Sequence, residues 1–499
     1  MKKILFKNTL VALVAFSLLQ GCSKEEVIEI FPEYSLDALS NPSSMKQVGE
    51  VLTGAYAGFR ASNYYGSASG TGAGWSIMPD AMSDNLYESA AETLANSRDM
   101  ADWLYTTNTG QISAFYSAPY QVIAAANIVI RDVDKFTTEL NQKEANRIKG
   151  QALAIRALAH FDLFRYFAPS YDKNASSSLA LAYVKEFVVS TSIKPTRMSN
   201  PDYYQNLLAD INEAITLLGD VDMDINEPGL TTRAYIDQNA AYAIAARIHL
   251  YAGNWTDAAS AAFNALSAND GRPLATTQSA FSGMYDETDI GEAIWNVKFE
   301  SGQSGPTYIM YWPNNGRSYF RPVPEIAVAE GTSGLIRSDD IRHLAFFTPD
   351  DNGISITKYQ GKAAADGNAN FPAIRSGEML LIHAEALARS GSESQGLASL
   401  NLLRGSRISD YTDLNLSGQA LLDAIADERR AELVAEGHRF FDLKRTNKTI
   451  NRGYPCGETS ISASGECSLS SGDRQWTLPI PQSVINANEN MVQTPGWEN

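Results

Sequence analysis

Basic residues and long apolar runs are both scarce in this sequence. Its 499 residues contain 40 lysines and arginines against 57 aspartates and glutamates, which gives a formal net charge of −17. Because phosphate contacts need clustered basic side chains, this balance disfavours nucleic-acid binding. The apolar run from Leu10 to Leu19 has about ten residues, whereas a helix that spans a bilayer needs roughly 20. The sequence therefore does not predict a membrane-spanning helix.

Enzyme motifs are also missing. Gly66 to Gly70 (GSASG) has the wrong spacing for the Gly-x-Ser-x-Gly nucleophile elbow of hydrolases. Ala363 follows Gly361-Lys362, where a phosphate-binding loop requires Ser or Thr. Hydrogen-bonded packing is the expected role of the histidines that lie in segments rich in Ala and Leu, namely His160, His249 and His383. We expect no enzymatic activity and no cofactor.

One acidic segment resembles a metal site only in part. Asp220, Asp222 and Asp224 alternate as in a calcium-binding loop, but Ile225 stands where such a loop needs glycine. The alternative is a solvated acidic turn, which fits this composition better. No metal site is predicted.

The N-terminus has the pattern of an export signal. Three lysines precede the apolar run, which ends in Leu19-Gln20-Gly21-Cys22. A small residue directly before a cysteine resembles the cleavage box of bacterial lipoproteins, in which Cys22 becomes the lipidated first residue and several acyl chains give a stable anchor. An ordinary signal peptide with a chance cysteine is the alternative. Ser23-Lys24-Glu25-Glu26 resembles the signal that directs lipoproteins of Bacteroidota to the cell surface.

Two cysteines remain in the rest of the chain. Cys456 and Cys467 flank the Gly/Ser-rich stretch GETSISASGE, which can close a small loop. An exported chain favours oxidation of such a pair, and two cysteines without a nearby histidine are a poor zinc set. We predict a disulfide between them, with two free thiols as the alternative.

Helical periodicity dominates the rest of the chain. From Asn239 to Leu266, small and apolar residues recur at a spacing near 3.6, and Gly253-Asn254 interrupts them. Two such helices around a tight turn resemble a tetratricopeptide hairpin. Similar patterns predict helices at 120–133, 144–167, 202–218, 376–390, 395–406 and 420–436, and a short helix after Gly437. Between 268 and 373, Gly-, Pro- and Asn-rich sequence with β-like runs at 293–299 and 354–359 predicts irregular insertions on one side of a mainly α frame.

The segment from Arg429 to Arg445 (RRAELVAEGHRFFDLKR) concentrates charged residues. Glu432 and Glu436 lie four residues apart, on one face of the predicted helix, and Gly437 suits a left-handed helix end. The surrounding guanidiniums favour ionised carboxylates, whereas a general acid needs a raised pKa. The spacing also lacks the His-x3-His pair of metallopeptidases. We therefore predict ion pairs that fix helix packing rather than an acid–base or metal centre.

This charged segment resembles the C-terminal signature of the SusD/RagB family of surface glycan-binding lipoproteins. Gly150 to Tyr171 is similar to the first conserved helix of that family. Ile374 to Gly391 is similar to its Arg-x-Ser-Glu helix, with Gly377 as an extra residue, and Leu478 to Trp497 is similar to its closing tail. These segments occur in the family's order and cover almost the whole mature chain.

The resemblance implies a tetratricopeptide-like scaffold that binds oligosaccharide and delivers it to a SusC-type TonB-dependent transporter in the outer membrane. The expected parts are a signal peptide at 1–21, a lipid-anchored linker at 22–40 and a single domain at 41–499. Within the domain we expect the scaffold at about 41–267 and 374–450, the ligand-loop insertion at about 268–373 and a tail at 451–499. The alternatives are a receptor for peptide or another nutrient, a hydrolase on a helical frame, and a helical-repeat adaptor that binds protein.

Carbohydrate binding needs exposed aromatic planes beside polar side chains, because sugars combine apolar C–H faces with hydroxyl groups. Two loop stretches offer both. The candidates in the first are Tyr64, Tyr65 and Trp75, and those in the second are Tyr308, Tyr311, Trp312, Asn314, Arg317 and Tyr319. For each ring, packing in the core is the alternative, and core packing is what we expect of Trp103 and Trp295. Asp80, Asp84 and Asn85 are candidates for contacts with sugar hydroxyls or for helix capping.

Overall fold

The computed structural model describes residues 40–68, 72–93, 95, 97–190, 192–219, 232–268, 273–300, 303, 305–306, 317–329, 333–359, 361 and 369–498. The chain divides into residues 1–43 and residues 44–499, and the fold below is that of the second unit. The predicted signal peptide, Cys22, nearly all of the linker and the acidic segment 220–224 lie outside the described residues.

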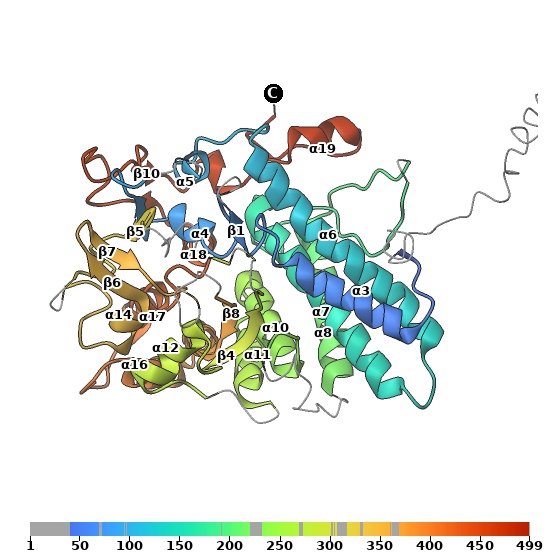
Figure 1. Cartoon of the computed structure of the whole chain (residues 1–499), viewed down its shortest axis with the longest axis horizontal. Helices are drawn as coiled ribbons and strands as arrows, with labels where there is room; N and C mark the ends of the chain where they lie inside the picture. Colours follow the sequence, from blue (N-terminus) through green and yellow to red (C-terminus); the bar gives the residue numbers. More distant parts are fainter. Residues whose placement is uncertain are drawn as a thin grey trace, which may run out of the picture. The chain divides into compact units, whose positions relative to one another are not determined.

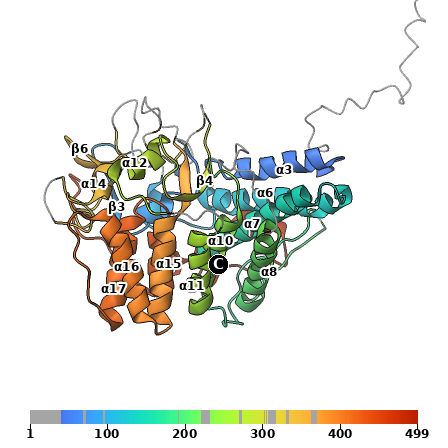
Figure 2. The same ribbon diagram turned by 90° about the horizontal axis from the view of Figure 1, so that it is seen from below.

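A row of long helices forms the frame. They are α3 (Met45–Gly58), α6 (Gly110–Asp132), α7 (Gln142–Phe167), α8 (Asn200–Gly219), α10 (Gln238–Ala252), α11 (Trp255–Ser267), α15 (Ser376–Arg389), α16 (Glu393–Arg407) and α17 (Gly418–Glu432). Each helix packs against the next along the chain, so that helical hairpins stack side by side (Figures 1 and 2). The prediction of a mainly α, tetratricopeptide-like scaffold is confirmed.

The helix ends follow local chemistry. The side chain of Asp237 accepts a hydrogen bond from the backbone N–H of Ala240 at 2.8 Å and so caps α10. Gly253 ends the same helix with a φ of 67°, a left-handed conformation that glycine adopts without steric cost. This glycine is the predicted break between α10 and α11.

Helix α7 runs through the core. Every residue from Gly150 to Phe167 is buried, so this helix has no polar face over that length. Its charged side chains are paired inside the protein, as Arg156 is with Asp210 at 2.7 Å. His160 contacts the hydroxyl of Tyr203 at 3.1 Å, and burial lowers the pKa of His160 to about 3. The predicted packing role of this histidine is confirmed.

The insertions are short strands and short helices. The strands pair as β1 (Ser67–Ala68) with β2 (Gly72–Ala73), β3 (Leu86–Glu88) with β5 (Phe320–Pro322), β4 (Ala293–Val297) with β8 (Phe371–Arg375), β6 (Phe347–Asp350) with β7 (Gly353–Ile356), and β9 (Ile450–Asn451) with β10 (Ser468–Leu469). The short helices are α4 (Met78–Ala81), α5 (Arg98–Ala101), η1 (Val133–Phe136), α12 (Gln278–Asp286), α14 (Ile341–Phe346), α18 (Arg439–Arg445), η2 (Arg474–Trp476) and α19 (Gln482–Ala487). Figure 2 shows β4, β6, α12 and α14 on one side of the row of long helices, as predicted.

Helix α17 is shorter than the predicted 420–436, because it ends at Glu432. The carboxylate of Asp80, on α4, accepts hydrogen bonds from the backbone N–H groups of Ala435 at 3.0 Å and Gly437 at 2.8 Å. These bonds hold the chain in a turn in which Ala435 has a φ of 59° and Gly437 a φ of 79°. A long-range partner therefore sets this helix end, and α18 then packs against α4 rather than mainly against α17.

Membrane-spanning and metal-binding features were sought in the same residues. Within the described ranges, no helix combines the length and apolar character that crossing a bilayer requires. Nor do three or more His, Cys, Asp or Glu side chains of those ranges converge in a way that could hold a metal ion.

Candidate functional site

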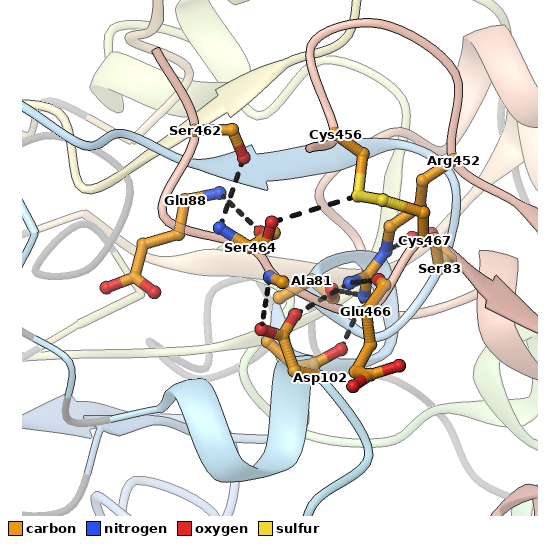
Figure 3. Close-up of a disulfide and its surroundings, with 12 residues drawn as sticks. Ala81, Ser83, Glu88, Asp102, Arg452, Cys456, Ser462, Ser464, Glu466 and Cys467 are labelled. Carbon is orange, nitrogen blue, oxygen red and sulfur yellow. Dashed lines mark hydrogen bonds and ion pairs between the residues drawn. A yellow bond between two sulfur atoms is a disulfide. The ribbon is translucent and has the colours of Figure 1, made fainter. Parts of the chain in front are cut away.

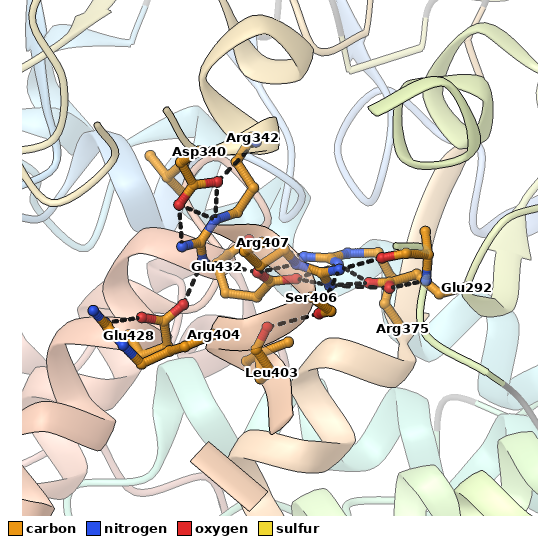
Figure 4. A network of polar contacts seen from close by, with 12 residues as sticks. Glu292, Asp340, Arg342, Arg375, Leu403, Arg404, Ser406, Arg407, Glu428 and Glu432 are labelled. Carbon is orange, nitrogen blue, oxygen red and sulfur yellow. Dashed lines mark hydrogen bonds and ion pairs between the residues drawn. The ribbon is translucent and has the colours of Figure 1, made fainter. Parts of the chain in front are cut away.

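A buried cluster of charges lies where α14 to α17 meet (Figure 4). The carboxylate of Glu432 accepts hydrogen bonds from Arg342, Arg375 and Arg407 at 2.8 to 3.1 Å. All four side chains are fully buried. The cluster contains five carboxylates and five cationic groups, namely Glu292, Asp340, Glu428, Glu432 and Glu436 with Arg342, Lys358, Arg375, Arg404 and Arg407.

The electrostatics of this charge cluster are those of a structural core. Burial alone would raise the pKa of Glu432, but the guanidiniums of Arg407, Arg375 and Arg342 hold it well below its usual value. A carboxylate in this state is a permanent acceptor rather than a proton donor. The extra residue Gly377 fits here because a β-carbon at its position would lie 2.4 Å from an oxygen of Glu432. The predicted ion pairs are confirmed.

The rest of the charged segment forms further pairs. Arg429 donates to Asp442 at 2.8 Å, Arg439 donates to Asp84 at 2.7 and 2.8 Å, and Arg445 binds Glu385 through two hydrogen bonds of 2.7 Å. These pairs connect α17 and α18 to α15 and to the loop after α4. Asp84 is thus engaged inside the protein, where the sequence left open a contact with sugar hydroxyls.

The first predicted aromatic platform is wrong as an exposed surface. Tyr64, Tyr65 and Trp75 are only 0%, 4% and 2% exposed. The hydroxyls of both tyrosines donate to the carboxylate of Asp162 on α7, at 2.7 and 3.0 Å. The ring of Trp75 packs edge-on against Tyr166, with centroids 4.3 Å apart. A buried acceptor draws these rings into the core, next to Trp295, which is buried as predicted.

The second predicted stretch is only partly described. Tyr308, Tyr311, Trp312 and Asn314 lie outside the described residues. Arg317 is exposed, immediately before β5. Tyr319 is 5% exposed, so its prediction as an open platform is wrong. Its backbone oxygen accepts a hydrogen bond from Ser89 at 2.9 Å, which fixes the residue in the strand pairing.

The strand pair β3–β5 brings the N-terminal loop segment and the insertion together. Tyr87 pairs with Arg321, so their side chains lie on the same face of the two strands. Backbone hydrogen bonds from Ser89 to Tyr319 and from Val323 to Asn85 extend the pairing at both ends. On the Tyr87 face lies the exposed ring of Tyr454, from the C-terminal tail, which is close enough to Tyr87 to influence its pKa. We call this face, formed by Tyr87, Glu92, Arg321, Asp350 and Tyr454, the β3–β5 surface.

Fixed polar groups flank the exposed ring on this surface. Arg321 donates to both oxygens of Asp350 at 2.9 and 3.0 Å and to Glu92 at 2.6 Å. Burial would raise the pKa of Asp350, but hydrogen bonds from Arg321 and Ser355 hold it below its usual value. The side chain of Asp350 is 30% exposed and so presents an ionised acceptor to solvent. Burial raises the pKa of Tyr87, which keeps its phenol neutral and able to donate. An aromatic plane beside an acceptor and a donor suits a sugar.

Sequence reasoning missed Tyr454 and Asp350. Both tyrosine and proline in Tyr454-Pro455, next to the predicted disulfide, carry the same loop-aromatic signal that selected the other stretches. Of the aromatic side chains in the described ranges, Tyr454 and Phe263 are the exposed ones, at 58% and 57%. Only Tyr454 of these two has the polar surroundings of the β3–β5 surface.

Two cavities lie elsewhere. One of about 1140 Å³ opens among α10, α15, α17 and α18, and its deeper charged groups are paired with one another, as Glu385 is with Arg445. Another of about 240 Å³ lies between α3 and β4 and is lined by Tyr56, Tyr235 and Asn296. Neither contains a ring as exposed as that of Tyr454. The β3–β5 surface is therefore the candidate site.

Comparison with known proteins points to one family. A family model described as "Starch-binding associating with outer membrane" matches residues 41–250, and the model of the SusD family matches residues 351–497. SusD-like protein P38 of Formosa agariphila is 24% identical, over 90% of this chain and 93% of that protein. A SusD superfamily structure from Bacteroides vulgatus has a TM-score of 0.76 at 23% identity and covers 91% of this chain and 100% of its own. A laminarin-binding SusD-like protein has a TM-score of 0.65 at 20% identity, over 91% of this chain and 99% of its own. The structural matches establish the fold.

Proposed function

Because the chain belongs to the SusD family, we propose that it is a cell-surface lipoprotein of the outer membrane that captures oligosaccharides. In this proposal Cys22 carries the lipid anchor, and a SusC-type TonB-dependent transporter receives the bound glycan. The protein itself breaks no bond in the ligand.

The observation that carries this proposal is the β3–β5 pairing. It joins two segments more than 200 residues apart in sequence, from Tyr87 to Arg321, and it places an exposed ring beside a fixed, ionised carboxylate. Tyr308, Tyr311, Trp312 and Asn314 complete the site in this proposal, because they immediately precede Arg317 and β5 in sequence. Family relatives that bind starch-like or β-glucan chains support the ligand class.

Physical magnitudes favour weak binding. A ring that loses about 100 Å² of apolar surface contributes roughly 2.5 kcal/mol, whereas association itself costs at least about 4 kcal/mol. Two or three rings with several hydrogen bonds are therefore needed for net affinity. We expect dissociation constants from high micromolar to millimolar, near −4 to −6 kcal/mol. Such affinities suit a protein that must release its ligand to a transporter.

Affinity electrophoresis of the purified full-length protein tests the ligand class. Gels that contain soluble starch, laminarin or other polysaccharides should retard the protein in at least one case. Trp312→Ala should reduce this retardation, because it removes one stacking plane, whereas Phe263→Ala removes an equally large apolar ring on the exposed side of α11 and should not. If no polysaccharide retards the protein and a peptide library binds it, the ligand class is wrong.

Cell fractionation tests the location and the partner. Cys22→Ser should shift the protein from the outer-membrane fraction to a soluble fraction, because the lipid anchor is lost. The unmodified protein should copurify with a SusC-type transporter from detergent-solubilised membranes. Protein that stays in the membrane after Cys22→Ser would contradict the lipid anchor.

A further inference from the structure

The C-terminal tail supplies a loop that lies along β3 (Figure 3). Cys456 and Cys467 form the predicted disulfide, with sulfur atoms 2.01 Å apart, and they close the loop between them. Ala90 donates a backbone hydrogen bond to Ile461 at 2.9 Å, and Ala463 donates one to Glu88 at 2.8 Å. The loop therefore pairs with one edge of β3, while β5 pairs with the other edge.

The base of this loop is anchored in the core. The guanidinium of Arg452 binds the carboxylate of Asp102 at 2.8 Å and the backbone oxygens of Ser83 and Ala81 at 3.0 and 2.9 Å (Figure 3). It also lies over the ring of Trp103, 4.2 Å from the centroid. The same carboxylate of Asp102 accepts a hydrogen bond from Gly465, at the far end of the loop, at 2.9 Å. One buried carboxylate thus holds both ends.

Tyr454 stands between the two anchors. It lies two residues after Arg452 and two residues before Cys456, in a turn in which Cys456 donates to the backbone oxygen of Gly453 at 2.9 Å. Gly453 approaches the insertion so closely that a β-carbon on it would lie 2.6 Å from an oxygen of Glu325. Little chain length remains for the ring to move away from the β3–β5 surface.

From this geometry we propose that the disulfide-closed loop 453–467 is the third wall of the glycan site and that Tyr454 is a ligand-stacking residue which the disulfide positions. The inference rests on the proposed function and assigns to it a residue and an element outside the N-terminal loops and the insertion. The ring is exposed where a core tyrosine would be buried, and it adjoins the neutral phenol of Tyr87 and the ionised Asp350. Ordering the loop before binding removes part of the entropic cost of association.

A double-mutant cycle tests stacking and positioning together. The full-length protein, Tyr454→Ala, the pair Cys456→Ser/Cys467→Ser, and the triple variant are titrated with the polysaccharide that retards the parent, starting with soluble starch and laminarin. Tyr454→Ala should weaken binding about tenfold, as expected for the loss of one stacked ring. The cysteine pair should weaken it roughly threefold to tenfold, because the loop must be ordered on binding. The triple variant should bind no more weakly than Tyr454→Ala, because the disulfide acts through that ring.

The controls separate this inference from the proposed function. Phe263→Ala, which removes a ring of matching exposure on α11, should bind like the parent. Urea unfolding of each variant shows whether the scaffold stays folded under the binding conditions, and Tyr454→Phe, which keeps the ring, should restore binding if the alanine variant loses it. If the parent is retarded but Tyr454→Ala binds equally well, or if the cysteine pair leaves affinity unchanged, the inference is wrong and the proposed function stands. If no glycan retards the parent, both fail.

Discussion

Replacing Glu432 with glutamine tests the role of the charged segment most directly. The change keeps the shape of the side chain and removes one negative charge from a cluster of five carboxylates and five cationic groups. Four N–H groups from three guanidiniums, at 2.8 to 3.1 Å, lose their ionised acceptor. The new amide also directs its own N–H groups toward those donors. Glu432→Gln should therefore leave an uncompensated positive charge in a site that solvent does not reach.

The expected loss of stability is large. One charge pair at about 4 Å contributes roughly 4 kcal/mol at an effective dielectric constant near 20, and three guanidiniums surround this carboxylate. The desolvation cost of the carboxylate, several kcal/mol, is removed at the same time and offsets much of that sum. Breaking one partner of a buried ion network typically costs about 3 to 5 kcal/mol. We expect the same loss here, a large part of the roughly 5 to 15 kcal/mol by which proteins are stable.

Urea denaturation, followed by circular dichroism, measures this loss. Glu50→Gln is the matched control, because Glu50 pairs with Lys46 at 3.7 Å on the exposed side of α3, and it should change the unfolding free energy by no more than about 0.5 kcal/mol. Folded Glu432→Gln protein should still bind the glycan that retards the parent. A loss below about 1 kcal/mol, or a loss of binding at unchanged stability, would refute the structural role of the cluster.

Three further predictions concern stability. Trp75→Ala should lose about 3 to 5 kcal/mol of unfolding free energy in urea titrations, because the ring is buried, and the folded variant should bind glycan normally; weaker binding at full stability would reinstate the ring as a surface platform. Gly377→Ala should lose about 1 to 3 kcal/mol, since its β-carbon would lie 2.4 Å from Glu432, whereas Gly49→Ala on α3 meets no atom within 4 Å and should be neutral or stabilising. For Glu385, burial would raise the pKa, but neighbouring guanidiniums lower it from 4.5 to about 2. Its contribution is therefore complete above pH 4.5 and lost as the pH falls toward 2, about 3 kcal/mol in all, so unfolding curves of Glu385→Gln should lack this part of the acid dependence; an identical pH profile would contradict the pairing.

The helical frame was predictable because its signals are local. The spacing of apolar residues in α7, α10 and α15 and the left-handed Gly253 act within a few residues of the chain, and the structure places these helices within a few residues of their predicted ends. Helix α17 is the instructive exception. Its end depends on Asp80, more than 300 residues earlier, which binds the turn at Ala435 and Gly437. No local pattern contains that information.

The candidate site was less predictable for the same reason. Tyr64 and Tyr65 lie in a Gly/Ser-rich loop, where exposure is the usual outcome, yet Asp162 on α7 draws both hydroxyls into the core. Tyr454, which no family segment marked, remains exposed because the tail is held along the edge of β3. Residue type and loop context show which rings could bind sugar, but they do not show which rings are free to do so.

By itself the sequence determined that this chain folds as stacked helical hairpins, that its concentrated charges would neutralise one another, and that its two late cysteines would pair. Periodicity, charge complementarity and short loop closure act over short stretches of chain or through composition. Only the tertiary structure decided which aromatic rings reach solvent and which strands meet beside them. Burial of a ring depends on acceptors and packing surfaces that the folded chain brings from distant positions.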